Sequence, residues 1–279
     1  MIGSEGLKGK IRNIANSKNL RSQEVLQMFF FERFLERLSK SKYKFNFVIK
    51  GGLLISSMIG IDNRTTMDMD TTIKGVPLKE EVIRNIISEI INVEVNDGIE
   101  FEITNISHIR EEDEYENFRV HLIANFDKIK NDIKIDITTG DAITPKEIEY
   151  LYPCMFQEES LRVLAYPLET ILAEKYESVI KRNITTTRMR DFYDLYNLYN
   201  LRKEEIDFDI LKQAIISTAN RRESLPLMKQ AIEIIEDIKD DDYLKELWKV
   251  YLADNLYVGD LNFSETVKVV EIIAEKNAL

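Results

Sequence analysis

Two aspartates separated by a single residue carry the clearest chemical signal in this sequence. Asp68 and Asp70 lie in the stretch MDMDTTI (residues 67–73), whose side chains alternate in the manner of a β-strand. Because side chains two positions apart project from the same face of a strand, both carboxylates can share a hard divalent cation such as Mg²⁺ or Mn²⁺. Such a cation bridges protein carboxylates and the phosphates of a substrate.

A third acid occupies the centre of IKIDI (residues 133–137). The isoleucines of this stretch alternate toward one face, which leaves Asp136 on the other face of the predicted sheet. On a strand that neighbours Asp68 and Asp70, Asp136 would complete a one- or two-metal site. In such a site the cations bridge a triphosphate and activate an attacking hydroxyl.

A pair of glycines upstream supplies a second element of phosphate chemistry. Gly51 and Gly52 follow the β-rich run at 45–50 and precede the apolar run at 53–59, which predicts strand, glycine turn and helix. Glycines at such a turn let backbone N–H groups approach phosphate oxygens, beside the positive end of the helix. A Gly-Gly pair alone is usually only a turn. Its place just before the Asp-x-Asp strand suggests that both elements hold one nucleotide, and neither a P-loop nor a Rossmann motif competes with them.

These elements predict an α+β fold in which helices flank a mixed or antiparallel sheet, followed by an all-α region. We place a nucleotide-binding α+β domain at residues 1–165 and a helical domain at 166–279. An exposed connection is expected at 111–116. Strands are predicted at 45–50, 67–73, 100–110, 117–126 and 132–138, and helices at 23–38, 53–59, 79–91, 168–181, 188–201, 208–220, 225–239, 243–254 and 264–276.

Charge and composition exclude several classes of protein. With one cysteine and two histidines, a Cys/His zinc site cannot form. The net charge of −11 argues against a uniformly basic nucleic-acid surface, yet residues 1–50 carry eleven Lys/Arg against four Glu. This segment is either a basic face for a polyanion or a solvated amphipathic helix. The chain has no long apolar run, and its first twenty residues lack an apolar core, so a cytoplasmic protein without a membrane span is expected.

Four blocks of the sequence resemble the AbiEii/AbiGii type of abortive-infection toxin, within the DNA-polymerase-β-like nucleotidyltransferases. Gly51-Gly52 stands where the superfamily usually has Gly-Ser, and Thr66 where it often has Ser. The resemblance implies a toxin that transfers a nucleoside monophosphate from an NTP to an RNA such as the tRNA 3′ end, with a separately encoded antitoxin. It leaves GTP or CTP open as the substrate. The blocks are VIKGG (48–52), RTTMDMD (64–70), IKIDI with Gly140, Asp141 and Pro145, and LAYPLET to RMRDFYDL (164–195).

Carried over by position, the resemblance makes Asp68, Asp70 and Asp136 metal ligands, with Asp136 also able to deprotonate the acceptor. It implies that Lys175 meets the triphosphate, where an ammonium would stabilise the charge that develops on pyrophosphate. A surface lysine paired with Glu174 or Glu177 is the alternative. Asp191 and Asp194 either face Lys175 or form a cap and surface pair, and we favour Asp191 for the site. Nucleotide contacts are expected from Lys50, Gly51, Gly52, Thr66 and Lys175.

The acceptor is the least constrained part of the hypothesis. Arg182, Arg188 and Arg190 lie in a local basic stretch that could meet RNA phosphates. Two other functions stay open: a regulator that binds nucleotide or RNA without transfer, and a transferase that modifies a protein hydroxyl. The presence of the three acids together with Lys175 argues against the first of these.

Overall fold

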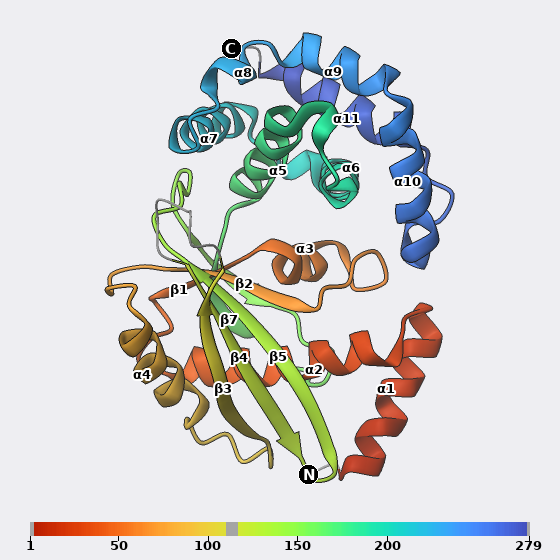
Figure 1. The fold of residues 1–279 in the computed structure, drawn as a ribbon. Helices are drawn as coiled ribbons and strands as arrows, with labels where there is room; N and C mark the ends of the chain where they lie inside the picture. Colours follow the sequence, from red (N-terminus) through yellow and green to blue (C-terminus); the bar gives the residue numbers. More distant parts are fainter. Residues whose placement is uncertain (1–2, 110–116, 278–279) are drawn as a thin grey trace. The chain divides into compact units, whose positions relative to one another are not determined.

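A computed structural model describes residues 3–109 and 117–277, so the connection expected at 111–116 lies outside the described residues. Contacts divide the chain into two compact units. The first contains residues 1–140 and 148–165, and the second contains 141–147 and 166–279. The α+β fold class with a helical C-terminal region is confirmed (Figure 1).

A seven-stranded mixed sheet organises the first unit, in the order β3-β4-β5-β2-β1-β7-β6. The pairs β1–β7 and β2–β5 are parallel and the other neighbours are antiparallel. The described strands are β1 (Phe47–Lys50), β2 (Asp68–Ile73), β3 (Glu100–His108), β4 (Phe118–Phe126), β5 (Ile129–Thr138), β6 (Ile148–Tyr152) and β7 (Leu161–Ala165).

Amphipathic helices cover this sheet. Helix α2 (Ser22–Lys40) packs against β5 and β7 and buries three phenylalanines completely, Phe30, Phe31 and Phe34. Helix α4 (Glu80–Ile91) packs against α2 and β3 through isoleucines at helical spacing. Helix α3 (Gly51–Ile59) contacts β1 and β2. Helix α1 (Ser4–Lys18) packs on α2 and was not expected from the sequence.

The second unit is helical. Helix α5 contacts α6, α7 and α8, and α11 packs against α6 and α9. The helix expected at 225–239 is two helices, since the chain leaves α8 at Met228 and enters α9 at Ala231. The helices are α5 (Leu168–Arg182), α6 (Met189–Arg202), α7 (Phe208–Arg221), α8 (Leu225–Met228), α9 (Ala231–Asp240), α10 (Asp242–Asp254) and α11 (Phe263–Lys276), with short 3₁₀ turns at Asn183–Thr185, Lys203–Glu205 and Leu256–Val258.

Two further features differ from the sequence-based expectation. Strands β6 and β7 extend the sheet beyond β1, although only five strands were expected. The glycines after β1 do not form a separate turn, because α3 begins at Gly51 itself. Within the described residues, no helix is both long and apolar enough to cross a membrane.

Candidate active site

Four charged residues form one row across four neighbouring strands of the sheet. Asp70 on β2 is the direct partner of Asp136 on β5, and each acid has a cation as its partner on the other side. Arg119 on β4 lies opposite Asp136, and Lys50 on β1 lies opposite Asp70. Because directly paired residues share a face of the sheet, the row reads cation, acid, acid, cation. Asp68, two residues before Asp70, lies on the same face.

Arg119 holds the carboxylate of Asp136 in a two-pronged ion pair. Its Nε donates to Oδ1 at 2.7 Å and its Nη2 to Oδ2 at 2.8 Å. This geometry uses the planar fork of the guanidinium and fixes the orientation of the carboxylate. The hydrogen bond to Asp136 raises the pKa of Arg119 further above its usual range, and the charges of Asp136, Asp68 and Asp70 act in the same direction.

Gly51 lies where the carboxylate of Asp70 approaches the first turn of α3. Its φ of +62° is one that side chains rarely adopt, and a Cβ at this position would lie 2.1 Å from Asp70 Oδ2. The N–H of Gly52 points to the same oxygen at 3.4 Å, a long contact. The expected proximity of the glycine pair to the Asp-x-Asp strand is therefore present, with the helix N-terminus directly at the acid.

Gly52 makes an equally close approach to Thr66. A Cβ on Gly52 would lie 2.7 Å from Thr66 Oγ1. The Thr66 hydroxyl donates to the carbonyl of Asp68 at 3.0 Å, and the Asp68 N–H points back to it at 3.4 Å. Thr66 is buried and holds the start of β2 in place. Its expected contact with nucleotide stays a prediction, and its observed contacts are with Asp68.

Lys50 reaches along the sheet from the end of β1. Its Nζ donates to Thr138 Oγ1 on β5 at 2.7 Å, and the side chain is half-buried. The ammonium therefore contacts β5, the strand that carries Asp136, and Lys50 lies on the face of the sheet that also carries Asp70. A cation in this position suits the expected nucleotide contact.

The donor chemistry of this row fits a divalent cation held by two carboxylates. Mg²⁺ is commonly bound by one or two carboxylates together with substrate phosphates, and Asp68 and Asp70 provide such a pair. A group of three or more Asp, Glu, His or Cys side chains placed to hold a metal ion is not found in the described part of the chain. The expected set of three metal-binding acids is therefore not assembled in this structure, since Arg119 takes the carboxylate of Asp136.

A second charged cluster lies within the helical unit. Lys175 on α5 places its Nζ 2.6 Å from Asp191 Oδ1 and 2.9 Å from Asp194 Oδ2 on α6. Ser178 and Arg188 also reach Asp191 Oδ2, at 3.0 and 3.2 Å. Both aspartates are buried, so the cap-and-surface alternative for them is wrong.

The surface alternative for Lys175 is also wrong. Glu174 and Glu177, its suggested partners, instead bind Arg222, each at 2.8 Å. The side chain of Lys175 is 15% exposed, and two carboxylates already hold its ammonium. The observed contacts of Lys175 join α5 to α6. Its expected action on a triphosphate stays a prediction.

Comparison with known proteins places these residues in a family. The family model of the nucleotidyl transferase AbiEii toxin, Type IV TA system, matches residues 33–269. The chain belongs to the AbiEii nucleotidyltransferase toxin family. Its activity class is accordingly nucleotidyl transfer. No curated protein matches the chain.

Two crystal structures of H. pylori proteins share the fold of this AbiEii chain. One, a candidate nucleotidyltransferase, is 18% identical and covers 93% of this chain and 96% of its own, with a TM-score of 0.54. The other, JHP933, is 16% identical and covers 91% of each chain, with a TM-score of 0.53. At these identities the likeness concerns the fold alone.

Two of the eleven Lys/Arg side chains in residues 1–50 are buried, so these two cannot add to a basic face. Arg37 is 3% exposed and binds Asp97 at 2.8 Å, and Arg33 is 9% exposed and binds Glu36 at 2.8 Å. Arg37 thus ties α2 to Asp97, whereas Arg33 pairs within α2 and also donates to Gln157 Oε1 at 2.6 Å. They belong neither to a surface for a polyanion nor to the fully solvated helix face that was the alternative.

The basic stretch of the helical unit is more open. Arg182, Arg188 and Arg190 are all exposed, as contact with RNA would require. Arg188 forms an ion pair with Asp191, and Arg182 donates a hydrogen bond to Ser178 Oγ at 3.4 Å. Binding of RNA to these arginines stays a prediction.

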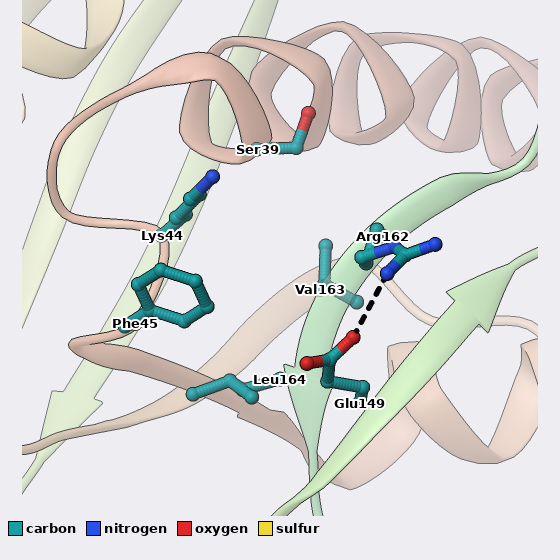
Figure 2. Close-up of a pocket in the computed structure, with 7 residues that line it drawn as sticks. All are labelled: Ser39, Lys44, Phe45, Glu149, Arg162, Val163 and Leu164. Atoms are coloured by element: carbon teal, nitrogen blue, oxygen red, sulfur yellow. Dashed lines mark hydrogen bonds and ion pairs between the residues drawn. The ribbon is translucent and has the colours of Figure 1, made fainter.

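A separate small cavity of about 180 Å³ opens at the other end of β1 in the AbiEii chain, before Phe47. Figure 2 shows Lys44 and Phe45 on one side of it and an ion pair between Arg162 and Glu149, at 3.2 Å, on the other. Ser39 of α2 and Val163 and Leu164 of β7 also line it. The row of acids is not part of this cavity's lining.

Arg119 is the residue of the site that sequence reasoning missed. The stretch FRVHLIANF (118–126) alternates buried and half-buried positions, which places Arg119 on the polar face. That alternation was visible in the sequence. Its partner was not, because the register between β4 and β5 decides which residue lies opposite Arg119.

Proposed function

We propose that this nucleotidyltransferase moves a nucleoside monophosphate from an NTP to an RNA hydroxyl, with the tRNA 3′ end as the favoured acceptor. The row of Arg119, Asp136, Asp70 and Lys50 beside the N-terminus of α3 supports this most directly. Its acids can bind a metal cation and accept the proton of the acceptor hydroxyl. Its lysine and the backbone N–H groups at the start of α3 can bind phosphate.

Each group in the row has a distinct part in the proposed reaction. Asp68 and Asp70 would hold Mg²⁺ or Mn²⁺, which when bound neutralises phosphate charge and favours the attacking alkoxide. Asp136 accepts the proton of the acceptor hydroxyl, as a general base. The backbone N–H groups at Gly51 and Gly52 and the ammonium of Lys50 bind and orient the triphosphate.

The toxin role follows from the family and brings a partner with it. We propose that transfer to RNA inhibits translation or growth and that a separately encoded antitoxin relieves this inhibition. The family supports an antitoxin partner and an NTP substrate.

A protein hydroxyl is a second candidate acceptor. The net charge is −11, and ion pairs occupy Arg33 and Arg37 of the N-terminal basic segment, which leaves less positive surface for RNA. An acidic body repels RNA outside its local basic patches. A protein acceptor would meet no such repulsion.

The deciding experiment is a labelling assay with the purified protein and Mg²⁺. Each α-³²P-labelled NTP is supplied in turn with total RNA or with protein extract, beside an Asp68→Asn/Asp70→Asn double variant. Label in RNA from one NTP, absent in the double variant, supports the proposal. Label in protein alone supports the second acceptor. Label in neither, from a folded enzyme, contradicts both proposals.

A further inference from the structure

We propose that Arg119 is a positioning residue of the transfer reaction, which orients Asp136 and lowers the affinity of the site for its divalent cation. The inference rests on the proposed function, since it assumes that Asp136 receives the acceptor proton. Its two parts come from two observations: the geometry of one ion pair and the number of acids around one guanidinium.

The orienting part follows from the geometry of the pair. Both nitrogens that Arg119 presents to Asp136 lie within 2.8 Å of a separate carboxylate oxygen. A two-pronged contact fixes the plane of the carboxylate, whereas a single contact leaves the plane free to turn. The strands add to this constraint, because Arg119 and Asp136 are direct partners in the β4–β5 ladder. A lysine at position 119 would retain the charge and lose the fork.

The second part follows from charge. Arg119 is the direct partner of Asp136, which is the direct partner of Asp70, and Asp68 lies two residues before Asp70 on the same face. The charges of Asp68 and Asp70 accordingly raise the pKa of Arg119 in addition to the effect of Asp136. The positive charge of Arg119 therefore lies near Asp68 and Asp70, the residues that are expected to bind the divalent cation. Like charges repel one another, and this repulsion disfavours a divalent cation beside the guanidinium. Arg119 therefore weakens binding of the free cation while it keeps Asp136 oriented.

The pair is not primarily a support of the core. The side chain of Arg119 is 35% exposed and that of Asp136 is 14% exposed, so neither is sealed inside the sheet. A partly exposed ion pair contributes little to stability. An orienting role is thus favoured over a structural one, and the two roles predict different measurements.

The test compares Arg119→Gln, Arg119→Lys and a matched control, Arg162→Gln. Arg162 also lies on a strand of this sheet and pairs with an acid, Glu149, but its side chain is 73% exposed and it lies outside the row. Binding of Mn²⁺ alone is measured by calorimetry, kcat and KM by labelling, and folding by thermal melting.

Arg119→Gln should bind Mn²⁺ roughly fivefold more tightly and lose roughly tenfold or more in kcat, with KM for the NTP little changed. Arg119→Lys should keep the wild-type Mn²⁺ affinity and recover only part of kcat. Arg162→Gln should match the wild type in both.

Two outcomes overturn the inference. Unchanged kcat in a folded Arg119→Gln variant removes the orienting role, and unchanged or weaker Mn²⁺ binding removes the charge role. The calorimetry separates this failure from failure of the proposed function, because it needs no acceptor. If the wild type transfers nothing to RNA or protein, tighter Mn²⁺ binding by Arg119→Gln still supports the charge part.

Discussion

Asp70 and Asp136 are direct partners in the parallel pairing of β2 with β5, so two carboxylates lie side by side on one face of the sheet. Adjacent like charges repel, and proteins tolerate them where cations or a bound metal offset the repulsion. Lys50 and Arg119 flank the two acids in the same register. Because these cations offset the charge of the two acids, exchange of an acid for an amide should affect the chemistry more than the fold.

Asp68→Asn and Asp70→Asn should each reduce transfer by at least roughly a hundredfold, because each removes one carboxylate from the expected cation site. The melting temperature should change by only a few degrees, since both side chains are only half-buried. Label incorporation and thermal melting check this. The control is Asp132→Asn, an exposed acid on β5, which should keep full activity. A folded Asp70→Asn enzyme with wild-type turnover would contradict the assignment.

Gly51→Ala should damage both stability and activity. Alanine at a φ of +62° costs about 1–2 kcal/mol, and its Cβ would meet Asp70 Oδ2 at 2.1 Å, so the carboxylate must move. Urea denaturation and turnover measure the two effects. Gly9→Ala in α1 is the matched control, because no atom within 4 Å obstructs its Cβ. That variant should be neutral or up to about 1 kcal/mol more stable. Equal stability and equal turnover of the two variants would show that Asp70 does not crowd position 51.

Lys175→Ala should lower the free energy of unfolding by about 3–5 kcal/mol, because it removes the ammonium that two buried carboxylates share. Both carboxylates lie within 3 Å of Nζ and are at most 3% exposed. Lys181→Ala on the same helix, where the side chain is 46% exposed, should cost less than about 1 kcal/mol. Urea denaturation measures both.

The same Lys175 variant tests the catalytic expectation. If the ammonium acts on the triphosphate, kcat per folded molecule should fall by roughly a hundredfold. Turnover is measured at a temperature where the variant remains folded. Wild-type kcat in that folded fraction would assign Lys175 to stability alone.

Glu32 should make stability depend on pH in an unusual direction. Burial raises the pKa of this α2 carboxyl to about 7 from its ordinary 4.5, although it accepts N–H bonds from Met155 and Phe156 at 2.7 and 3.2 Å. Between these two values the folded chain keeps the proton and the unfolded chain loses it, so unfolding releases a proton. Stability from Glu32 is therefore complete below pH 4.5 and is lost as the pH rises to about 7, by at most roughly 3 kcal/mol.

Urea denaturation of the wild type and of Glu32→Gln from pH 5 to 8 isolates this contribution, since other groups titrate equally in both. The wild type should lose stability relative to the variant as the pH rises. A constant difference across this range would show that Glu32 ionises normally.

Replacing Arg182, Arg188 and Arg190 together with Ser should weaken RNA binding across sequences. Each lost phosphate contact lowers the slope of log affinity against log salt by about 0.7–0.9, so the slope should flatten by about two. NTP binding should be nearly unchanged. Serine at Arg84, Lys245 and Lys249, which are also exposed, is the control. If the triple variant labels RNA at the wild-type rate and with the wild-type salt slope, RNA does not bind at these three arginines.

The sequence alone was sufficient for the elements whose pattern is local. The 3.6-residue spacing around Phe30 and Phe34 predicted α2, and the alternation around Asp68 and around Asp136 predicted β2 and β5. Such patterns record which side of an element is buried, and they need no knowledge of its neighbours. The same locality explains the errors. Strand β6 is a five-residue edge strand with two exposed apolar residues, so its pattern is weak.

The tertiary structure decided which of these residues meet. Strand register is set by pairing between segments far apart in the chain, and a slip of one residue would turn Asp136 to the opposite face. Arg119 became the partner of Asp136 only through that register. The sequence left two alternatives for Asp191 and Asp194, and the packing of α5 on α6 decided that they pair with Lys175. The residue types that could do chemistry were readable along the chain. The choice among possible partners, and the pairing of Arg119 with Asp136, were not readable, because the free energy that selects them comes from burial and strand pairing between distant segments.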